Sequence, residues 1–392
     1  MKITRVDVFV LDDPDKAQWH PIWVRIHTDE GIYGDGEAGL AYGVASSAAF
    51  GMVKDYAALI IGDDPLDHET IWNKLYKTTF WGQNGGPVTF SGVSAIDIAL
   101  WDIKGKFFKR PVYQLLGGKF RDKLRTYASQ LQHGWSETRG FLGKTEDYGT
   151  VAREVVEKEG YDAIKVDFIA IGPDGKRRNL NGGELSKLLS PEDADRFVER
   201  MAATREAVGP KVDIIVENHS ITDAQSAVQA AERIKKYHIF YYEEPATPNP
   251  KLFDYIQQRT NLPLASGERI YSRWQYIPYF ENSSLQVIQP DLANTGGITE
   301  GKKLADAAYI YDVSVQPHIA GSPISIAAAL HLEAAIPNFI IHEHHFPNQY
   351  NRKLAIHDYQ PEQGFFTVPE LPGLGNEISE FAIAHSVKVT MK

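Results

Sequence analysis

Acidic side chains and one histidine recur at regular intervals through the second half of the chain. They follow short apolar segments and comprise Asp167, Glu217, Glu243, Glu268, Asp291, His318 and Glu343. From Glu217 onward the successive gaps are 26, 25, 23, 27 and 25 residues. A repeating unit of one strand and one helix explains this spacing, because each unit returns the chain to the same rim of a barrel. We therefore expect these side chains to converge on one site.

Three consecutive segments end in glutamate, at Glu217, Glu243 and Glu268. Three carboxylates that face one point repel one another and cannot all ionise without a cation between them. Hard divalent cations take oxygen ligands, and Mg²⁺ keeps coordination positions for water and substrate oxygens. The glutamates are therefore candidate metal ligands, and the alternative is a set of solvated acids on the rim.

Two histidines are candidate acid–base groups. Asp291 and His318 end neighbouring segments, and a carboxylate beside an imidazole fixes its tautomer and raises its basicity. His318 is thus a candidate base. His219 stands two residues after Glu217, on the same side of that strand, and is a candidate general acid or a polar lid contact.

Lys165 shares one side of its predicted strand with Asp167. We expect it to pair with a substrate carboxylate or with Asp167, and a purely structural ion pair fits the pattern equally well. A second cluster, at 342–345, resembles a metal motif, but the zinc-protease pattern requires histidine where Phe346 stands. We interpret Glu343 as pointing inward and the histidines at 342, 344 and 345 as outer-face or loop residues.

The elements that must position these residues are short apolar strands that alternate with helix-like stretches from about residue 124. The strands read RTYAS, DAIKVDF, VDIIVEN, HIFYYEEP, LPLASGE, LQVIQPD, VSVQPH and NFIIHE. This rhythm is typical of a closed parallel α/β barrel. The connection 169–196 is long, polar and glycine-rich, which predicts a lid or binding loop; a surface insertion is the alternative.

The first 120 residues have a different pattern. Apolar residues alternate at Val6, Val8 and Val10, and again in the next two segments, which predicts a three-stranded antiparallel meander. The segment 88–106 has helical periodicity. This part of the chain is therefore expected to be α+β, and the tail after about residue 350 is expected to be rich in loops.

Composition narrows the class of protein. The net charge is −10, without a run of lysine and arginine, which disfavours nucleic acid and anionic membranes as partners. The chain contains no cysteine, which excludes disulfides, zinc–thiolate sites and thiol nucleophiles. Neither a signal peptide nor an apolar stretch of about 18 residues is present, so we expect a cytoplasmic location.

Several segments together resemble one family. IKVD, VENH, YYEEP, SGERI, QPDLANTGGIT, VQPH and IIHEHH, with VSAIDIALWDIKGK near the start and VPELPGLG near the end, resemble the mandelate racemase-like branch of the enolase superfamily. The resemblance implies a modified TIM barrel, (β/α)₇β, over residues 123–355 and an N-terminal α+β capping domain over residues 1–122. Residues 356–392 would pack on the capping domain.

The resemblance also implies roles for individual residues. The three glutamates would bind one Mg²⁺ per subunit, and Asp291 with His318 would form the catalytic dyad. Glu343 would hydrogen-bond the enolate oxygen, either protonated or through a partner. Reactions in this family begin with removal of the proton next to a carboxylate.

Two departures from the family pattern narrow the reaction. Racemases carry Lys-x-Lys on the second strand, whereas this chain has Lys165-Val166-Asp167. Glu217-Asn218-His219 is similar to the galactonate and gluconate dehydratases, in which this histidine protonates the departing 3-hydroxyl. Asp291 argues against the mannonate dehydratases. We therefore expect elimination of water from an acid sugar, to give a 2-keto-3-deoxy acid.

The substrate contacts are less specified by sequence. The candidates are Trp19, His20, Tyr42, Asp167 and Arg269, with Trp135, Arg139, Arg177 and Arg178 in further loops; an arginine there could bind the second carboxylate of an aldarate. A racemase or epimerase with Lys165 or His219 as the second base is one alternative, and a non-catalytic sugar-acid binding protein is another. Family members are commonly dimers or octamers, so a homo-oligomer is expected.

Overall fold

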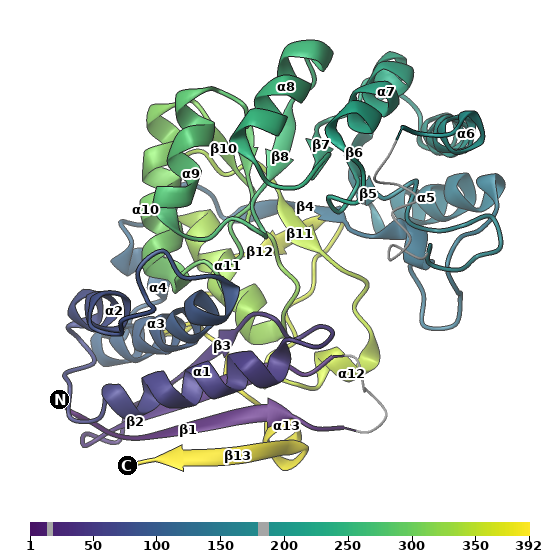
Figure 1. Cartoon of the computed structure of the whole chain (residues 1–392). Coiled ribbons are helices and arrows are strands. Elements are labelled where there is room, and N and C mark those ends of the chain that lie inside the picture. Colours follow the sequence, from purple (N-terminus) through teal and green to yellow (C-terminus); the bar gives the residue numbers. More distant parts are fainter. Residues whose placement is uncertain (14–18, 179–187) are drawn as a thin grey trace.

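A four-stranded antiparallel sheet carries both ends of the chain in this computed structural model, which describes residues 1–13, 19–178 and 188–392. The strand order is β13-β1-β2-β3, so the C-terminal strand lies beside the N-terminal one (Figure 1). The bounds are β1 (Ile3–Leu11), β2 (Ile22–Thr28), β3 (Tyr33–Ala38) and β13 (Ser386–Met391). The predicted meander of three strands is confirmed, and β13 adds a fourth.

Helices α1 (Ser46–Leu59) and α3 (Pro87–Phe108) pack against this sheet, and α2 (His68–Lys77) and the short α4 (Val112–Leu115) pack against α3. The contact between β3 and α3 is unusually close. A Cβ at Gly34 or Gly36 would overlap the backbone carbonyl oxygens of Ala99 or Ala95 in α3. Glycine is therefore required at both positions by the approach of the two backbones.

The second sheet is a parallel barrel. Its strands follow the order β4 to β11, with bounds β4 (Lys123–Ala128), β5 (Ala163–Val166), β6 (Asp213–Glu217), β7 (Tyr242–Glu243), β8 (Leu264–Ser266), β9 (Val287–Ile288), β10 (Ser314–Val315) and β11 (His342–His344). A parallel bridge between Val315 of β10 and Phe339, three residues before β11, closes the ring. The α/β barrel with an α+β capping domain is thereby confirmed.

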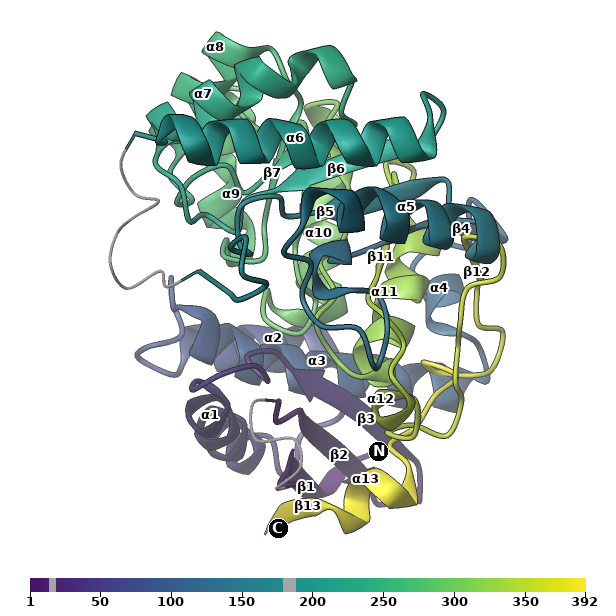
Figure 2. The ribbon, with the colours of Figure 1, turned by 90° about the vertical axis from the view of Figure 1, so that its right-hand side faces the viewer.

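Among the described residues, seven helices connect the eight strands and lie outside the ring: α5 (Thr145–Glu159), α6 (Pro191–Val208), α7 (Ala224–Ile234), α8 (Pro250–Thr260), α9 (Ser272–Glu281), α10 (Gly297–Ile310) and α11 (Pro323–Ala334). In Figure 2 the long helices α5 and α6 cross the viewer's side of the barrel, above the capping sheet. Two 3-10 turns, η2 (Leu131–His133) and η4 (Lys235–Tyr237), follow β4 and α7.

After β11 the chain continues through α12 (Gln349–Arg352), β12 (Phe365–Thr367) and α13 (Glu380–Ala384) before it reaches β13. Strand β12 pairs antiparallel with β4 outside the ring. The pattern of eight strands and seven intervening helices is the (β/α)₇β arrangement, in which the last segment of the chain replaces the eighth helix.

The starts of several barrel helices share a local signal. Ser190, Asn249 and Ser322 each accept a hydrogen bond on the side chain from a backbone N–H of the first turn. Each is followed by proline at the first helical position, where its missing N–H costs nothing and its fixed φ suits the helix. The sequence therefore fixes where these helices begin.

Helix α3 docks the capping domain on the N-terminus of α10. Ser94 Oγ accepts from the backbone N–H of Gly296 at 2.9 Å, and Asp97 Oδ2 accepts from that of Thr299 at 2.9 Å. Trp101 Nε1 donates to Thr299 Oγ1 at 2.8 Å. Acceptors at a helix N-terminus satisfy N–H groups that have no partner within the helix, so one face of α3 fixes the two domains against each other.

The long connection after β5 begins as a hairpin-like turn in which Ile171 pairs with Arg177. Residues 179–187 of the predicted lid lie outside the described residues. Across the part of the chain that the structure describes, every helix is too short or too polar to cross a membrane.

Candidate active site

The predicted rim residues lie at the carboxyl ends of the barrel strands. Glu217 and Glu243 are the last residues of β6 and β7, and Asp167 follows directly after β5. Glu268 lies two residues beyond β8, and His318 lies three beyond β10. Because the strands are parallel, these ends share one rim, and the side chains come together there.

Glu217, Glu243 and Glu268 form a group that we call the glutamate triad. Each offers one carboxylate oxygen, and these atoms lie within 4.8 Å of one another. Glu243 Oε2 is buried and has no hydrogen-bond partner among the described residues. An unpartnered buried carboxylate oxygen is costly, and it matches the oxygen ligands that Mg²⁺ prefers. The residues present therefore fit a divalent cation.

Lys165 places a buried positive charge beside the triad. Its Nζ lies 2.7 Å from an oxygen of Glu243 and 2.7 Å from an oxygen of Glu343. An oxygen of Glu217 lies 3.4 Å away. Burial raises the pKa of Glu243 to about 8 against the opposing charge of Lys165. The structure thus pairs Lys165 with barrel glutamates rather than with Asp167.

The imidazole of His318 lies between two carboxylates. Its Nδ1 is 2.8 Å from Asp291 Oδ2, and its Nε2 is 3.0 Å from Glu268 Oε2. Burial acts to lower the pKa of His318, but the charge of Glu268 and the hydrogen bond with Asp291 raise it well above its ordinary value. Burial acts to raise the pKa of Glu268, and the facing His318 lowers it to about 2. The Nε2 atom of His318 therefore points toward the triad.

His219 has a matching arrangement on the other side of the triad. Its Nδ1 is 2.8 Å from Asp167 Oδ2, and its Nε2 is 3.2 Å from Glu217 Oε1. Burial acts to lower the pKa of His219, but the charge of Glu217 and the hydrogen bond with Asp167 raise it to about 9. The side chains of His219 and His318 are 28% and 14% exposed, so a ligand in the mouth of the barrel can reach both.

Glu343 is surrounded by donors. Ser129 Oγ donates to its Oε1 at 2.8 Å, and the backbone N–H of Ile319 donates to its Oε2 at 3.0 Å. Burial acts to raise the pKa of Glu343, but Lys165 lowers it well below its ordinary value. Of the two roles expected for this residue, these contacts favour an ionised carboxylate that acts through a partner.

Two of the predicted substrate contacts, Asp167 and Arg269, lie in the site and are engaged by protein groups. Asp167 Oδ1 accepts from the backbone N–H groups of the two loop residues at 169 and 170. Arg269 forms ion pairs with Glu244 and, at 2.9 Å, with Glu268. Its side chain is nevertheless 40% exposed.

The three capping-domain candidates lie together. Trp19 and Tyr42 pair in an antiparallel bridge, and His20 directly follows Trp19. The backbone N–H of Gly39 donates to the carbonyl oxygen of Ala293 at 2.6 Å, so the loop after β3 touches the loop after β9. Tyr42 is 59% exposed. The structure thus pairs the segment before β2 with the loop after β3, and that loop touches the barrel through Gly39.

The further loop candidates have other partners. Arg139 pairs with Glu154 at 2.8 Å and Arg178 pairs with Asp193 at 2.6 Å, both on outer helices. Trp135 donates from Nε1 to a carboxylate at residue 159 and packs on rings outside the barrel. Arg177 lies 3.0 Å from His133 Nε2, in the turn after β4.

Sequence reasoning missed the residues that follow the first barrel strand. Gln130 Nε2 lies 3.2 Å from Glu217 Oε2 and 2.9 Å from His219 Nε2, and Ser129 binds Glu343. Both residues directly follow β4, so the signal that identifies the other rim residues, a polar residue after a barrel strand, also identifies these two. His345 is in the loop after β11, as expected, yet its Nε2 lies 3.6 Å from Glu343 Oε1.

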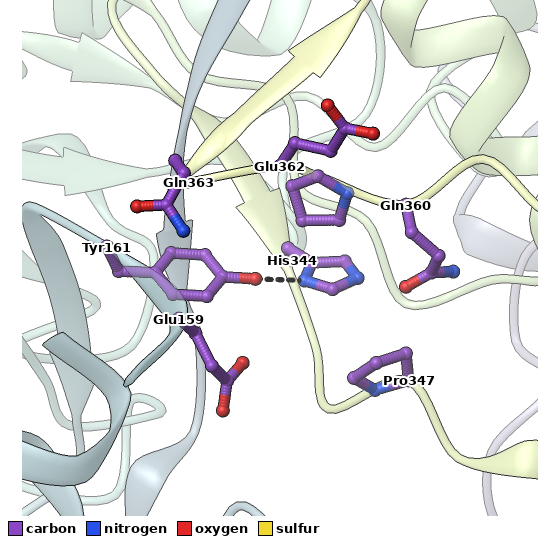
Figure 3. Close-up of a pocket in the computed structure, with 8 residues that line it drawn as sticks. Glu159, Tyr161, His344, Pro347, Gln360, Glu362 and Gln363 are labelled. Atoms are coloured by element: carbon purple, nitrogen blue, oxygen red, sulfur yellow. Dashed lines mark hydrogen bonds between the residues drawn. The ribbon is translucent and has the colours of Figure 1, made fainter. Parts of the chain in front are cut away.

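A cavity of about 480 Å³ opens on the outside of the barrel, where the last segment of the chain replaces the eighth helix. In Figure 3 the phenol of Tyr161 points toward the imidazole of His344, with 2.8 Å between the phenol oxygen and Nδ1. The lining residues are Glu159, Tyr161, His344, Pro347, Gln360, Pro361, Glu362 and Gln363. This cavity is therefore separate from the rim site.

Comparison with known proteins agrees with the fold. The family described as enolase C-terminal domain-like matches residues 147–382, and the N-terminal domain family of mandelate racemase and muconate lactonizing enzyme matches residues 16–117. The chain therefore belongs to the mandelate racemase-like branch of the enolase superfamily, as its sequence motifs predicted.

Relatives of known name and known structure cover almost the whole chain. The D-galactonate dehydratase of Ralstonia pickettii (strain 12J) is 32% identical over 99% of this chain and 95% of its own length. A crystal structure of a proposed dehydratase from Zymomonas mobilis ZM4 is 53% identical with a TM-score of 0.96, covering 100% and 99% of the two chains. A member of the enolase superfamily from Salmonella Typhimurium is 50% identical with a TM-score of 0.95, covering 100% of each chain.

Proposed function

We propose that this protein dehydrates an acid sugar, removing the proton next to the carboxylate and the hydroxyl on the following carbon to give a 2-keto-3-deoxy acid. The observation that carries the proposal is the pair of histidines, His219 and His318, each oriented by an aspartate and each facing the glutamate triad. The hydro-lyase class is confirmed by relatives named D-galactonate dehydratase.

The glutamate triad would hold one Mg²⁺, as the unpartnered oxygen of Glu243 and the close approach of the three carboxylates support. When bound, the ion would stabilise the negative charge that develops on the substrate carboxylate as the neighbouring carbon loses its proton. Lys165 and Arg269 add positive charge at the same place, because each lies beside a triad member.

His318 would act as the base. Its Nδ1 is held by Asp291, so the proton of the neutral ring sits on Nδ1 and the lone pair of Nε2 faces the site. A base must lie within hydrogen-bond reach of the proton that it removes. The position of Nε2 beside Glu268 supports this role, because a substrate whose carboxylate binds a cation held by the triad would lie next to it.

His219 would act as the acid. Its Nδ1 is held by Asp167, and protonated Nε2 can deliver a proton to the leaving hydroxyl. Glu217 ends β6 and Glu268 follows β8, and β7 lies between these strands, so the two histidines approach the triad from opposite ends. Elimination needs one group to take a proton at carbon 2 and another to give one at carbon 3, which this arrangement supplies.

A racemase or epimerase would instead use a second base at carbon 2. Lys165 suits this role poorly, because a base must be neutral to accept a proton. Its Nζ lies beside three carboxylates, which favour the charged ammonium form. His219 remains the candidate second base, so proton exchange and water loss must be measured separately.

The test is incubation of the purified protein with Mg²⁺ and a set of aldonates and aldarates, with detection of 2-keto-3-deoxy acids by a carbonyl reagent. His318→Asn serves as the control. Product from one acid sugar with the wild type and none with the variant supports the proposal. Incorporation of deuterium at carbon 2 in D₂O without any keto acid contradicts dehydration and favours the racemase.

A further inference from the structure

A carboxylate of the capping domain contacts the barrel domain where the loop that carries His318 meets α11. Glu37, the penultimate residue of β3, is fully buried. Its Oε1 accepts from the backbone N–H of Ser322 at 2.8 Å. Its Oε2 accepts from Ser322 Oγ at 2.6 Å and from the backbone N–H of Ser325 at 3.0 Å. The Glu37 side chain thus accepts three hydrogen bonds from the start of α11, two from Ser322 and one from Ser325.

The same loop is held at its other end by the barrel. Ile319, the residue after His318, donates its backbone N–H to Glu343 at 3.0 Å. The segment between the base and α11 is therefore only a few residues long and is fixed at both ends by a carboxylate. A displacement at the Glu37 end must be absorbed within residues 319–322, which directly follow His318.

Packing leaves little freedom around the Glu37 contact. Trp23 Nε1 donates to Ser322 Oγ at 3.0 Å, so the hydroxyl that binds Glu37 is itself oriented by the capping sheet. A Cβ on Gly321 would lie 2.6 Å from Ser325 Cβ and 2.9 Å from Glu37 Oε1. The loop can approach Glu37 this closely because residue 321 has no side chain.

We infer that Glu37 is a positioning residue of the capping domain, which acts through Ser322 and Ser325 to hold the His318 loop in the geometry needed for proton abstraction. The inference rests on the proposed dehydration for its kinetic readout. It goes beyond that proposal because it makes the capping domain part of the machinery that positions the base, in addition to any contact with substrate.

The ionised form of Glu37 can accept all three hydrogen bonds. Burial raises its pKa to about 7, although the bonds from Ser322 and Ser325 act to lower it; the charge of Asp291 adds to the rise. At about pH 8 the ionised form of Glu37 therefore predominates, and experiments at this pH test the role of the carboxylate. Glu37→Gln keeps the shape but replaces one acceptor oxygen by an amide NH₂, which faces a donor and breaks at least one of the three contacts.

Asp97→Asn is the matched control. Asp97 is also a fully buried carboxylate of the capping domain, burial likewise raises its pKa to about 7, and it likewise binds a barrel helix, through Thr299 of α10. It does not contact the loop between His318 and α11. A general weakening of the contact between the domains would affect both variants alike.

We expect Glu37→Gln to lower kcat by about 10- to 100-fold with KM within about twofold, because a small misplacement of a reacting group costs rate more than binding. The kinetic isotope effect with substrate deuterated at carbon 2 should rise in Glu37→Gln and stay unchanged in Asp97→Asn. Equal losses in both variants, or an unchanged isotope effect in Glu37→Gln, would overturn the inference.

A second measurement does not depend on turnover. Amide hydrogen exchange of residues 318–325 should quicken in Glu37→Gln and stay at the wild-type rate in Asp97→Asn. If the wild type dehydrates no acid sugar, the proposed function fails while this exchange still decides whether Glu37 holds the loop. If Glu37→Gln does not fold, Ser322→Ala replaces it; the same rise in isotope effect supports the inference, and its absence contradicts it.

Discussion

His219 Nδ1 lies 2.8 Å from Asp167 Oδ2, the same distance that separates His318 Nδ1 from Asp291 Oδ2. Each imidazole therefore turns its Nε2 toward a different member of the glutamate triad. Two aspartates thus orient two imidazoles toward the glutamate triad. A site built in this way can separate the removal of one proton from the delivery of another.

Substitutions of the two histidines should have different effects on catalysis. His318→Asn should abolish both keto-acid formation and exchange of the carbon-2 proton in D₂O, with a loss of about 100- to 10,000-fold, since general bases contribute factors of this size. His219→Gln should lose dehydration by a similar factor and keep exchange. Mass spectrometry of recovered substrate in D₂O measures the exchange. Loss of exchange in both variants would contradict separate roles.

Lys165 should stabilise the metal-free protein by neutralising its carboxylate neighbours. Removal of one partner from a buried ionic group costs about 3–5 kcal/mol, because uncompensated charge remains buried. Lys165→Met should therefore lower the free energy of unfolding by about that amount, and Mg²⁺ should restore part of it by supplying positive charge to the triad. Urea unfolding with and without Mg²⁺ measures both effects.

The matched control for that experiment is Lys302→Met. Lys302 pairs with Asp306 at the surface, at 2.6 Å, and exposed pairs of this kind contribute about 0–1 kcal/mol. A loss in Lys165→Met that is no larger than in the control, or that Mg²⁺ leaves unchanged, would show that the triad does not depend on this lysine.

Asp97 should make the protein less stable as the pH rises from about 4 to 7. Burial raises its pKa to about 7 in the folded protein, whereas an unfolded aspartate has a pKa of about 3.9. Within this window the folded state retains a proton that the unfolded state has lost, so the free energy of unfolding falls with pH, by about 4 kcal/mol in total. Asp97→Asn should remove this component.

Urea unfolding at a series of pH values between 4 and 8 measures the difference between wild type and Asp97→Asn. The difference should shift in favour of the variant as the pH rises. Asp195→Asn, at a side chain that is 68% exposed, should follow the wild type throughout. A constant difference between Asp97→Asn and wild type would contradict the elevated pKa.

Much of the barrel site could be predicted because the spacing of the strand–helix repeat predicts which residues share one rim of the barrel. A strand and a helix of similar length return the chain to one rim, so the spacing of Glu217, Glu243 and Glu268 along the sequence predicts that they lie together. The predicted metal ligands and acid–base residues are at that rim, and their roles stay predictions until activity is measured. The family assignment is confirmed by the matching domain families.

The contacts that sequence could not predict join segments far apart in the chain. Glu37 and Ser322 are separated by 285 residues, and no periodic pattern connects a capping strand with the loop of a barrel histidine. The pairing of β13 with β1 has the same character, since an amphipathic strand does not specify its neighbour. The alternation rule placed Lys165 and Asp167 on one side, but β5 ends at Val166, and Asp167 turns to His219 instead.

Gly36 offers a direct test of the packing between β3 and α3, and Gly51 in α1 is the control. Gly36→Ala would bring its Cβ 2.8 Å from the backbone nitrogen of Ala99, and helix backbone cannot shift as a flexible side chain can. We expect a loss of about 1–3 kcal/mol in the free energy of unfolding, the cost of overpacking a tight interior. Gly51→Ala in α1 meets no heavy atom within 4 Å among the described residues. Because alanine is the better helix residue, this variant should gain about 0.5–1 kcal/mol. Thermal and urea unfolding of both variants measure the two changes; a loss in both, or in neither, would contradict the close approach of β3 to α3.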